Sequence, residues 1–327
     1  MLMGRRSVRS FAPALLLAGL CLGPLGATAQ ELPAGDMKLI AAFPAGSGSD
    51  IVVRYFAEKL KTLANRTVIV ENKPGAGGNI ATEYVARSKP DGLTIYLHTG
   101  SSMSANQHIF KKPPVDVTKA LQVVGTINKQ AFMLVVHPDK PWKTVAELTA
   151  YVKERGDKAT YGVSATSGIV MGALYKQEAG LKSVEVTYRM AQDSMNDLSS
   201  GAVDYALLDP QFTMGQVNGG KLRVLGIASG KRQQSNPELP TMAEQGVKMD
   251  LNGWFAAFVP SATPRPTVDQ LNKWINQILA TDETRKFLAQ FASDPFPGTP
   301  DEGQALLIKD IGAWGEYVRI AKIPQQG

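Results

Sequence analysis

Two short loops rich in glycine and hydroxyl residues are the parts of this 327-residue sequence best suited to bind a ligand. The first, FPAGSGSD at residues 43–50, lies between a run typical of a buried strand and an amphipathic helix. Its small residues let backbone N–H groups approach a ligand, and the unpaired N–H groups at a helix start favour an anion. We expect Asp50 or Ser49 to cap this helix. An ordinary tight connection is the alternative, and a dinucleotide site is excluded because the third glycine of its fingerprint falls on Ile51.

The second loop, residues 164–168, also follows a predicted strand and precedes a predicted helix. It offers three hydroxyl groups and several amides to an anion, although it could serve only as a helix cap. A glycine-rich element at residues 74–79 also precedes a helix, and here we favour a turn that needs permissive backbone angles. Asp204 and Asp209, around a predicted strand at residues 203–208, could face a cleft, although salt-bridging is the more common role.

The sequence contains few residues for other kinds of chemistry. Its one cysteine, Cys21, lies in a predicted leader, so the rest of the chain can form neither a disulfide framework nor a thiol nucleophile. Of three histidines, His98 stands at a strand end and suits packing or loop chemistry better than base catalysis. The segment 215–221 matches G-x-x-x-x-G-K, but Leu222 stands where a phosphate-binding loop needs a magnesium-binding hydroxyl. We predict no cofactor, no metal site and no enzymatic activity, with an exported hydrolase as the alternative.

The first residues are typical of a secretion signal. Three arginines within residues 5–9 precede an apolar stretch at residues 11–25, and Ala-Thr-Ala at residues 27–29 forms a cleavage signature. We predict a signal peptide over residues 1–29 and a periplasmic mature chain that starts near Gln30. An uncleaved anchor is the alternative, although the stretch is short of the roughly 20 residues that span a bilayer. Without the three arginines the net charge falls from +6 to +3, too little for a nucleic-acid footprint.

Strand-like and helix-like segments alternate along the rest of the chain. The predicted strands are residues 37–43, 67–70, 93–98, 131–136, 159–163, 184–188, 203–208 and 222–228. The predicted helices are residues 50–63, 145–155, 170–179, 191–199, 268–279, 283–292 and 300–320. This alternation predicts an α/β fold with parallel sheets. We expect the chain to cross between two lobes near residues 131–138 and 252–260, which assigns residues 30–131 and 252–327 to lobe 1 and residues 132–251 to lobe 2.

Several longer motifs point to one family. They are FPAGSGSD at residues 43–50, VIVENKPGAGG at 68–78, KPDGLT at 89–94, KLRVLG at 221–226 and PTMAEQG at 240–246. Together they resemble the Bug-type extracytoplasmic solute receptors, the binding proteins of tripartite tricarboxylate transporters, whose first loop is P-A-G-G-G-T-D-like. The resemblance covers essentially the whole chain after the leader.

The resemblance implies a fold like that of type II periplasmic binding proteins, with two Rossmann-like lobes, a strand hinge and C-terminal helices on lobe 1. It implies that residues 43–50 hold one carboxylate of a small ligand, partly through water, and that residues 164–168 hold the other. Residues 99–102 are similar to a further cleft-lining turn. The residues that we expect at the ligand are Phe43, Ala45, Gly46, Ser47, Ser49, Asp50, Thr99, Ser101, Ser164, Thr166, Ser167, Gly168, Arg189 and Asp209.

The same resemblance implies that the loaded receptor docks on membrane permease subunits, with delivery to a histidine-kinase sensor as the alternative. We expect a monomer that neither inserts in the membrane nor binds nucleic acid. Alanine at Ser49, Asp50 or Thr166 is expected to weaken ligand binding more than folding.

Two departures from the family pattern bear on the ligand. Ile169 and Val170 stand where the family often has His-Leu, and residues 187–190, TYRM, stand where it often has P-Y-K-G. If they face the cleft, Ile169 and Met190 make its wall more apolar and bulkier. We therefore expect a dicarboxylate with substantial hydrocarbon content, such as a longer aliphatic or aromatic diacid. Compensating repacking of the core is the alternative.

Overall fold

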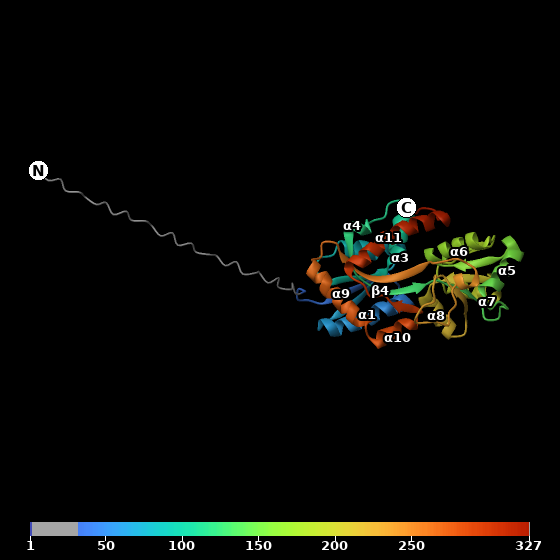
Figure 1. The fold of residues 1–327 in the computed structure, drawn as a ribbon, viewed down its shortest axis with the longest axis horizontal. Coiled ribbons are helices and arrows are strands. Elements are labelled where there is room, and N and C mark those ends of the chain that lie inside the picture. The colour runs from blue at the N-terminus through green and yellow to red at the C-terminus, as the bar shows by residue number, and fades with distance from the viewer. Residues whose placement is uncertain (2–31, 327) are drawn as a thin grey trace. The chain divides into compact units, whose positions relative to one another are not determined.

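Two mixed β-sheets with helices packed around them form the framework of the protein (Figure 1). The structure is a computed structural model that describes residue 1 and residues 32–326. The predicted signal peptide, residues 1–29, therefore lies outside the described residues apart from Met1. Among residues 32–326, none of the helices combines the length and the apolar character that a membrane span requires.

The first sheet has six strands in the order β11-β4-β10-β3-β1-β2. Its strands are β1 (Met37–Ala41), β2 (Val68–Asn72), β3 (Thr94–Thr99), β4 (Leu121–Ala131), β10 (Asn252–Pro260) and β11 (Ser293–Pro295). Strands β1, β2 and β3 pair in parallel, whereas β10 pairs antiparallel with both β3 and β4, and β11 antiparallel with β4. The prediction of parallel sheets is therefore wrong for this half, because β10 and β11 run opposite to the other four strands.

The second sheet has five strands in the order β7-β6-β8-β5-β9. They are β5 (Met133–Val136), β6 (Thr160–Val163), β7 (Val184–Thr187), β8 (Tyr205–Leu208) and β9 (Arg223–Ile227). Strand β6 pairs in parallel with β7 and β8, but β5 runs antiparallel to β8 and β9, so the parallel prediction fails here for β5. Helices α5 (Val145–Arg155), α6 (Thr166–Ala179), α7 (Asp193–Ser200) and α8 (Pro210–Asn218) connect these strands. We call the elements on the six-stranded sheet the first lobe and those on the five-stranded sheet the second lobe.

The helices of the first lobe cover both faces of its sheet. They are α1 (Gly48–Ala64), α2 (Asn79–Ala86), α3 (Gly100–Ile109), α4 (Val117–Ala120), α9 (Arg265–Leu279), α10 (Asp282–Ala289) and α11 (Pro300–Ile320). Alternate residues of β1 divide between the faces: Leu39 packs in the cluster with α1 and α9, and Ile40 in the cluster with α2 and α3. The core stripe of α1 continues from Leu60 to Ala64, whereas Leu63 is exposed.

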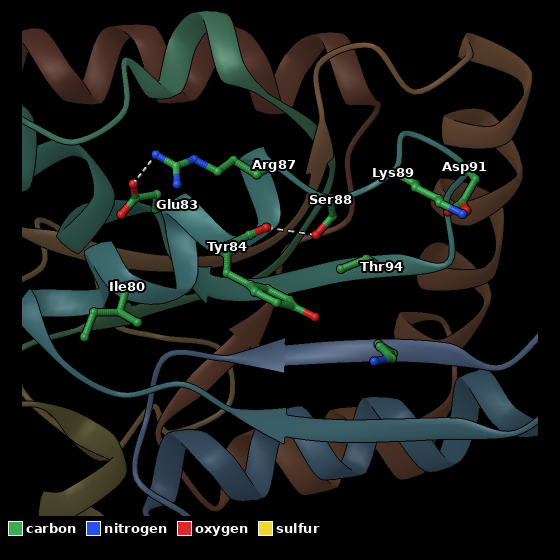
Figure 2. Close-up of a pocket in the computed structure, with 9 residues that line it drawn as sticks. Ile80, Glu83, Tyr84, Arg87, Ser88, Lys89, Asp91 and Thr94 are labelled. Carbon is green, nitrogen blue, oxygen red and sulfur yellow. Dashed lines mark hydrogen bonds and ion pairs between the residues drawn. The ribbon is translucent and has the colours of Figure 1, made fainter.

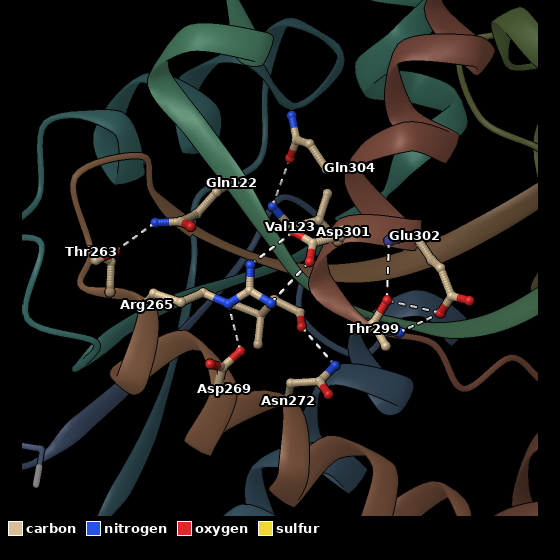
Figure 3. Close-up of polar contacts among 11 residues, drawn as sticks. Gln122, Val123, Thr263, Arg265, Asp269, Asn272, Thr299, Asp301, Glu302 and Gln304 are labelled. Carbon is tan, nitrogen blue, oxygen red and sulfur yellow. Dashed lines mark hydrogen bonds and ion pairs between the residues drawn. The ribbon is translucent and has the colours of Figure 1, made fainter. Parts of the chain in front are cut away.

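Short polar contacts fasten α9 and α11 to the strand β4 (Figure 3). Arg265 at the start of α9 donates to Asp269, 2.7 Å away, and to both carboxylate oxygens of Asp301 in α11. Asn272 donates to the Val124 carbonyl oxygen over 2.8 Å. The two acidic partners raise the pKa of Arg265, although such exposed ion pairs add little stability.

The chain passes from the first sheet to the second at Phe132, between β4 and β5, and returns at the start of β10. Asn252 in β10 pairs with Ala131 in β4, so the two crossing segments lie side by side. The first half of α11 packs on the first lobe through Leu307, whereas Trp314 in its second half joins an apolar core with second-lobe residues. The domain bounds 30–131, 252–327 and 132–251 stay a prediction.

Candidate ligand-binding site

A cavity of about 940 Å³ is lined by residues of both lobes. Most of the predicted ligand residues line it: Phe43, Gly46, Ser47, Ser49, Thr99, Ser101, Ser164, Thr166, Ser167, Arg189 and Asp209. The three others do not. Ala45 is exposed on its loop, Asp50 is buried beneath the loop, and a Cβ atom on Gly168 would lie 2.6 Å from the Leu207 carbonyl oxygen. Gly168 is therefore required for close packing of α6 on β8.

The loop at residues 43–50 is held together by the fully buried carboxylate of Asp50. Asp50 accepts hydrogen bonds from the Gly46 amide, the Asn72 side-chain amide and the Arg54 guanidinium, over 2.7, 2.7 and 2.8 Å. Burial alone would raise the pKa of Asp50, but these hydrogen bonds outweigh burial and lower it. The predicted cap is wrong, because Ser47 caps α1 by accepting from the Asp50 amide.

Four helices begin at this cavity, two from each lobe, but only two of them are capped by a side chain. In α1 the cap is Ser47, and in α8 it is Asp209, which accepts from the Phe212 amide over 2.9 Å. The residues before α3 and α6, Thr99 and Ala165, make no side-chain cap hydrogen bond. The first N–H groups of α3 and α6, one helix in each lobe, therefore stay available to an anion.

Two hydroxyl groups beside the start of α3 are buried without a partner. The Oγ of Ser101, whose side chain is 3% exposed, and the Oγ1 of Thr99 make no hydrogen bond among the described residues. Both residues line the cavity. A buried hydroxyl without a partner costs about 1–3 kcal/mol, so these groups indicate a polar ligand or water at this point.

The start of α3 rests on the indole ring of Trp254. A Cβ atom on Gly100 would lie 2.1 Å from that ring, so the first residue of α3 has to be glycine for this approach. Trp254 is held in turn by Asp310 of α11, which accepts its indole N–H over 3.0 Å. Burial raises the pKa of Asp310, and the hydrogen bond from Trp254 opposes that shift. The position of this helix start thus depends on the C-terminal helix.

Apolar side chains form much of the remaining wall. They are Phe43, Ile51, Phe132, Ile169, Phe212, Phe291 and Trp314. Ile169 faces the cavity as the hypothesis required, but Met190 does not line it and is 57% exposed, and Val170 is buried in the core. Sequence reasoning missed Phe132 and Trp314 as wall residues. The crossing predicted near Phe132 was the one available signal, because the cleft of a two-lobed fold lies beside its hinge.

Among the described residues that line the cavity, Arg189 is the one lysine or arginine. Its side chain is exposed and has no ion pair within the described part of the chain. Burial raises the pKa of the Asp209 carboxyl, while the amides that it caps oppose that shift. Asp204, the other carboxylate considered, accepts hydrogen bonds from Thr160 and Tyr151 and supports β6 rather than the cavity.

His98 lies behind the loop at residues 43–50. It is 2% exposed and packs between Tyr96 and Phe43, with ring centroids 5.0 and 5.3 Å away. Burial lowers its pKa to about 3, so the ring is neutral near pH 7. His98 is a packing residue, as expected from the sequence.

A second groove of about 770 Å³ lies on the first lobe, between α2 and the strands β1 and β3 (Figure 2). Its charged groups are largely paired with each other or with neighbours: Arg87 pairs with Glu83, and Lys38 with Glu71 over 2.7 Å. The motif at residues 89–94 contributes Lys89, Asp91 and Thr94 to it, but none of the residues expected at the ligand lines it. The cavity between the lobes is therefore the candidate site.

Comparison with known proteins shows which family the chain is similar to. Residues 52–321 match the model of the tripartite tricarboxylate transporter family receptor. Protein BugT of Bordetella pertussis is 27% identical over 296 residues, which cover 89% of this chain and 91% of BugT. The structure of periplasmic binding protein BugD is 28% identical, with a TM-score of 0.77 over 90% of this chain and 100% of BugD.

A further solved structure, that of R. palustris Rpa4515 with adipate, is 27% identical, with a TM-score of 0.82 over 90% of this chain and 100% of Rpa4515. The match to the family model, residues 52–321, includes elements of both lobes. The chain thus belongs to the tripartite tricarboxylate transporter receptor family, whose members are solute-binding receptors and not enzymes.

Proposed function

We propose that this protein captures a dicarboxylate between its lobes in the periplasm and delivers it to a membrane transporter of the tripartite tricarboxylate type. The observation that carries the proposal is the pair of uncapped helix starts, α3 in one lobe and α6 in the other, at one cavity. Each helix start bears a partial positive charge and free N–H donors, which suit a carboxylate. A ligand with a carboxylate at each end satisfies both at once.

The hydroxyl groups around these helix starts strengthen both anion positions. Ser101 and Thr99 supply unpartnered hydroxyls at α3, and Ser164, Thr166 and Ser167 line the cavity at α6. Each hydrogen bond to a charged carboxylate contributes about 1.5–3 kcal/mol. A few such hydrogen bonds offset the entropy lost on association and support micromolar affinity, which corresponds to a binding free energy of about −8 kcal/mol.

The apolar wall favours a ligand with a hydrocarbon body. Ile169 stands beside the start of α6, and Phe132, Phe212 and Trp314 add apolar surface to the same cavity. The solved structure of Rpa4515 carries adipate, an aliphatic diacid, which supports the same ligand class here. We infer that the ligand is an aliphatic or aromatic diacid longer than malate. Arg189, the cation of the wall, pairs with the carboxylate on the second-lobe side.

Calorimetry with malate, adipate and terephthalate tests the ligand class. We expect adipate or terephthalate to bind at least tenfold more tightly than malate, with no turnover. The same ligands should raise the unfolding free energy as RT ln(1 + [L]/Kd). Preference for malate would contradict the proposed hydrocarbon body, and binding of none of the three would contradict the dicarboxylate itself. Native mass spectrometry of gently purified protein would then identify a retained ligand.

Export and delivery have separate tests. We expect the protein from the periplasmic fraction to begin near Gln30, which N-terminal sequencing measures. A cytoplasmic full-length chain would contradict export. Cross-linking in cells should link the loaded receptor to permease subunits, and a link to a histidine-kinase ectodomain instead would favour sensing.

A further inference from the structure

Gly48 and Gln211 bring the two lobes into contact at the edge of the cavity. Gly48 is the first residue of α1 in the first lobe, and Gln211 is the second residue of α8 in the second lobe. A Cβ atom on Gly48 would lie 2.8 Å from the Gln211 Cβ, 3.1 Å from its carbonyl oxygen and 3.2 Å from its carbonyl carbon. These atoms are backbone or fixed to it, so no side-chain rotation could relieve the clash.

The backbone of Gly48 does not itself require glycine. Its φ is not positive, unlike that of Gly46 two residues earlier. An alanine at position 48 therefore suits the backbone at the start of α1, and the three nearest atoms that its Cβ would meet all belong to Gln211 of the opposite lobe. Glycine at position 48 is therefore needed for the close approach of the two lobes and not for the start of the helix.

Gln211 is held in place by a second interlobe contact. Its side-chain amide and that of Gln130 in β4 donate to each other's oxygen, one of the two hydrogen bonds being 3.2 Å long. Both side chains are nearly fully buried, at 6% and 2% exposure, and both line the cavity. Ser293 of β11 also donates to the Gln130 oxygen over 3.3 Å. A buried reciprocal amide pair is rigid, because moving either side chain leaves polar groups without partners.

We propose that the Gly48–Gln211 contact is the stop that sets how far the two lobes close, with the Gln130–Gln211 amide pair as its rigid support. The proposal rests on the proposed function, since closure over a ligand is what gives the stop a role. A side chain at position 48 keeps the lobes apart and leaves the two anion positions too far from each other for one ligand. Residue 48 thereby determines how long a ligand has to be to bind both lobes at once.

The test measures the distance between the lobes directly. Residues 30–327 contain no cysteine, so two introduced cysteines, Lys61→Cys on α1 and Glu154→Cys on α5, label one exposed position on each lobe. Spin labels at these positions report the distribution of interlobe distances with and without adipate and terephthalate. Gly48→Ala is the test variant. Gly312→Ala is its matched control, because it makes the same change in a helix with nothing within 4 Å of the new Cβ.

We expect a short-distance population in the parent protein that Gly312→Ala keeps and Gly48→Ala loses, with at least a tenfold loss of diacid affinity in Gly48→Ala alone. Two results would overturn the stop: a short population that persists in Gly48→Ala, or a single distance in the parent that no diacid changes. A loss of affinity without a change of distance assigns Gly48 to direct ligand contact instead. If no diacid binds but the short population still depends on Gly48, the stop stands and the proposed ligand class fails.

Discussion

The loops at the starts of α1 and α6 have similar sequences but different physical roles. Both are short, rich in small and hydroxyl residues, and face the same cavity from opposite lobes. At α1 the protein satisfies part of its own helix start, since Ser47 accepts from the Asp50 amide and Asp50 accepts from the loop amide of Gly46. At α6 the cap position is Ala165, which has no oxygen to offer. A side-chain cap therefore occupies an N–H group that an anion could otherwise use, and α6 keeps that group free.

The largest expected effect concerns Asp50, which holds the loop at the start of α1 together. Asp50→Ala removes a buried acceptor from three donors, so we expect the free energy of unfolding to fall by about 2–4 kcal/mol. Urea denaturation of the ligand-free protein measures it, with Ser49→Ala as the control on the same loop. This reverses the sequence-based expectation for Asp50. Unchanged stability together with lost binding would return Asp50 to the ligand.

The second effect is a dependence of stability on pH that comes from His98 behind the α1 loop. Its folded pKa of about 3 lies below the usual 6.5, so below pH 6.5 the unfolded chain binds a proton that the folded protein does not. Stability therefore falls as pH falls from 6.5 toward 3, by about 2 kcal/mol at pH 5. Denaturant melts of the parent and of His98→Phe at pH 7.5 and 5 measure this. An equal drop in both proteins would show that other groups cause it.

Much of the framework could be predicted from the sequence, because its signals are local. Helix α5 has the predicted bounds, since Thr144 and Glu147 form a capping box and Gly156 ends it. Strand β4 was missed because its sequence, LQVVGTINKQA, interrupts the apolar residues with glycine and polar residues. Its polar residues make contacts that are invisible in one sequence, such as Thr126 with the Phe296 carbonyl oxygen.

The candidate site could likewise be predicted from the sequence only in part. The loops that reach the cavity stand out in the sequence, but their division into capped and uncapped starts depends on where side chains point. Trp314 lies far along the chain in a helix whose other half packs on the first lobe, so only the tertiary fold brings it to the wall. Met190 had the same apolar signal as Ile169, yet it is exposed and does not line the cavity. Spacing alone could not separate these two residues.

A third prediction concerns α6, to which a substitution at Ala165 gives the side-chain cap that α1 has. Ala165 is exposed and has the extended backbone of a cap position, with φ −142° and ψ 159°. Ala165→Asp should cap α6 and thereby raise the free energy of unfolding by about 1 kcal/mol. The same change should weaken diacid binding at least tenfold, because the Asp carboxylate repels the ligand carboxylate and competes with it for the same amides. Ala165→Ser should lie between the two in both properties. Calorimetry and urea melts of the three proteins measure this, and a variant that gains stability without losing affinity would show that the ligand does not use this helix start.

The smallest effect concerns α3, where the comparison predicts that a hydroxyl serves the ligand and not the fold. The Ser101 Oγ is buried without a partner among the described residues, so Ser101→Ala removes no hydrogen bond within the protein. We expect the stability of the ligand-free protein to change by less than about 0.5 kcal/mol, whereas diacid affinity falls at least about tenfold, the value of one hydrogen bond to a charged carboxylate. Thr82→Ala is the matched control, because that buried hydroxyl of the same lobe is bonded to the Gly78 carbonyl oxygen and its loss should lower stability but not affinity. Equal losses of stability in the two variants would mean that Ser101 has a hydrogen-bond partner in the folded protein. Its hydroxyl group would then no longer support an anion position at the start of α3.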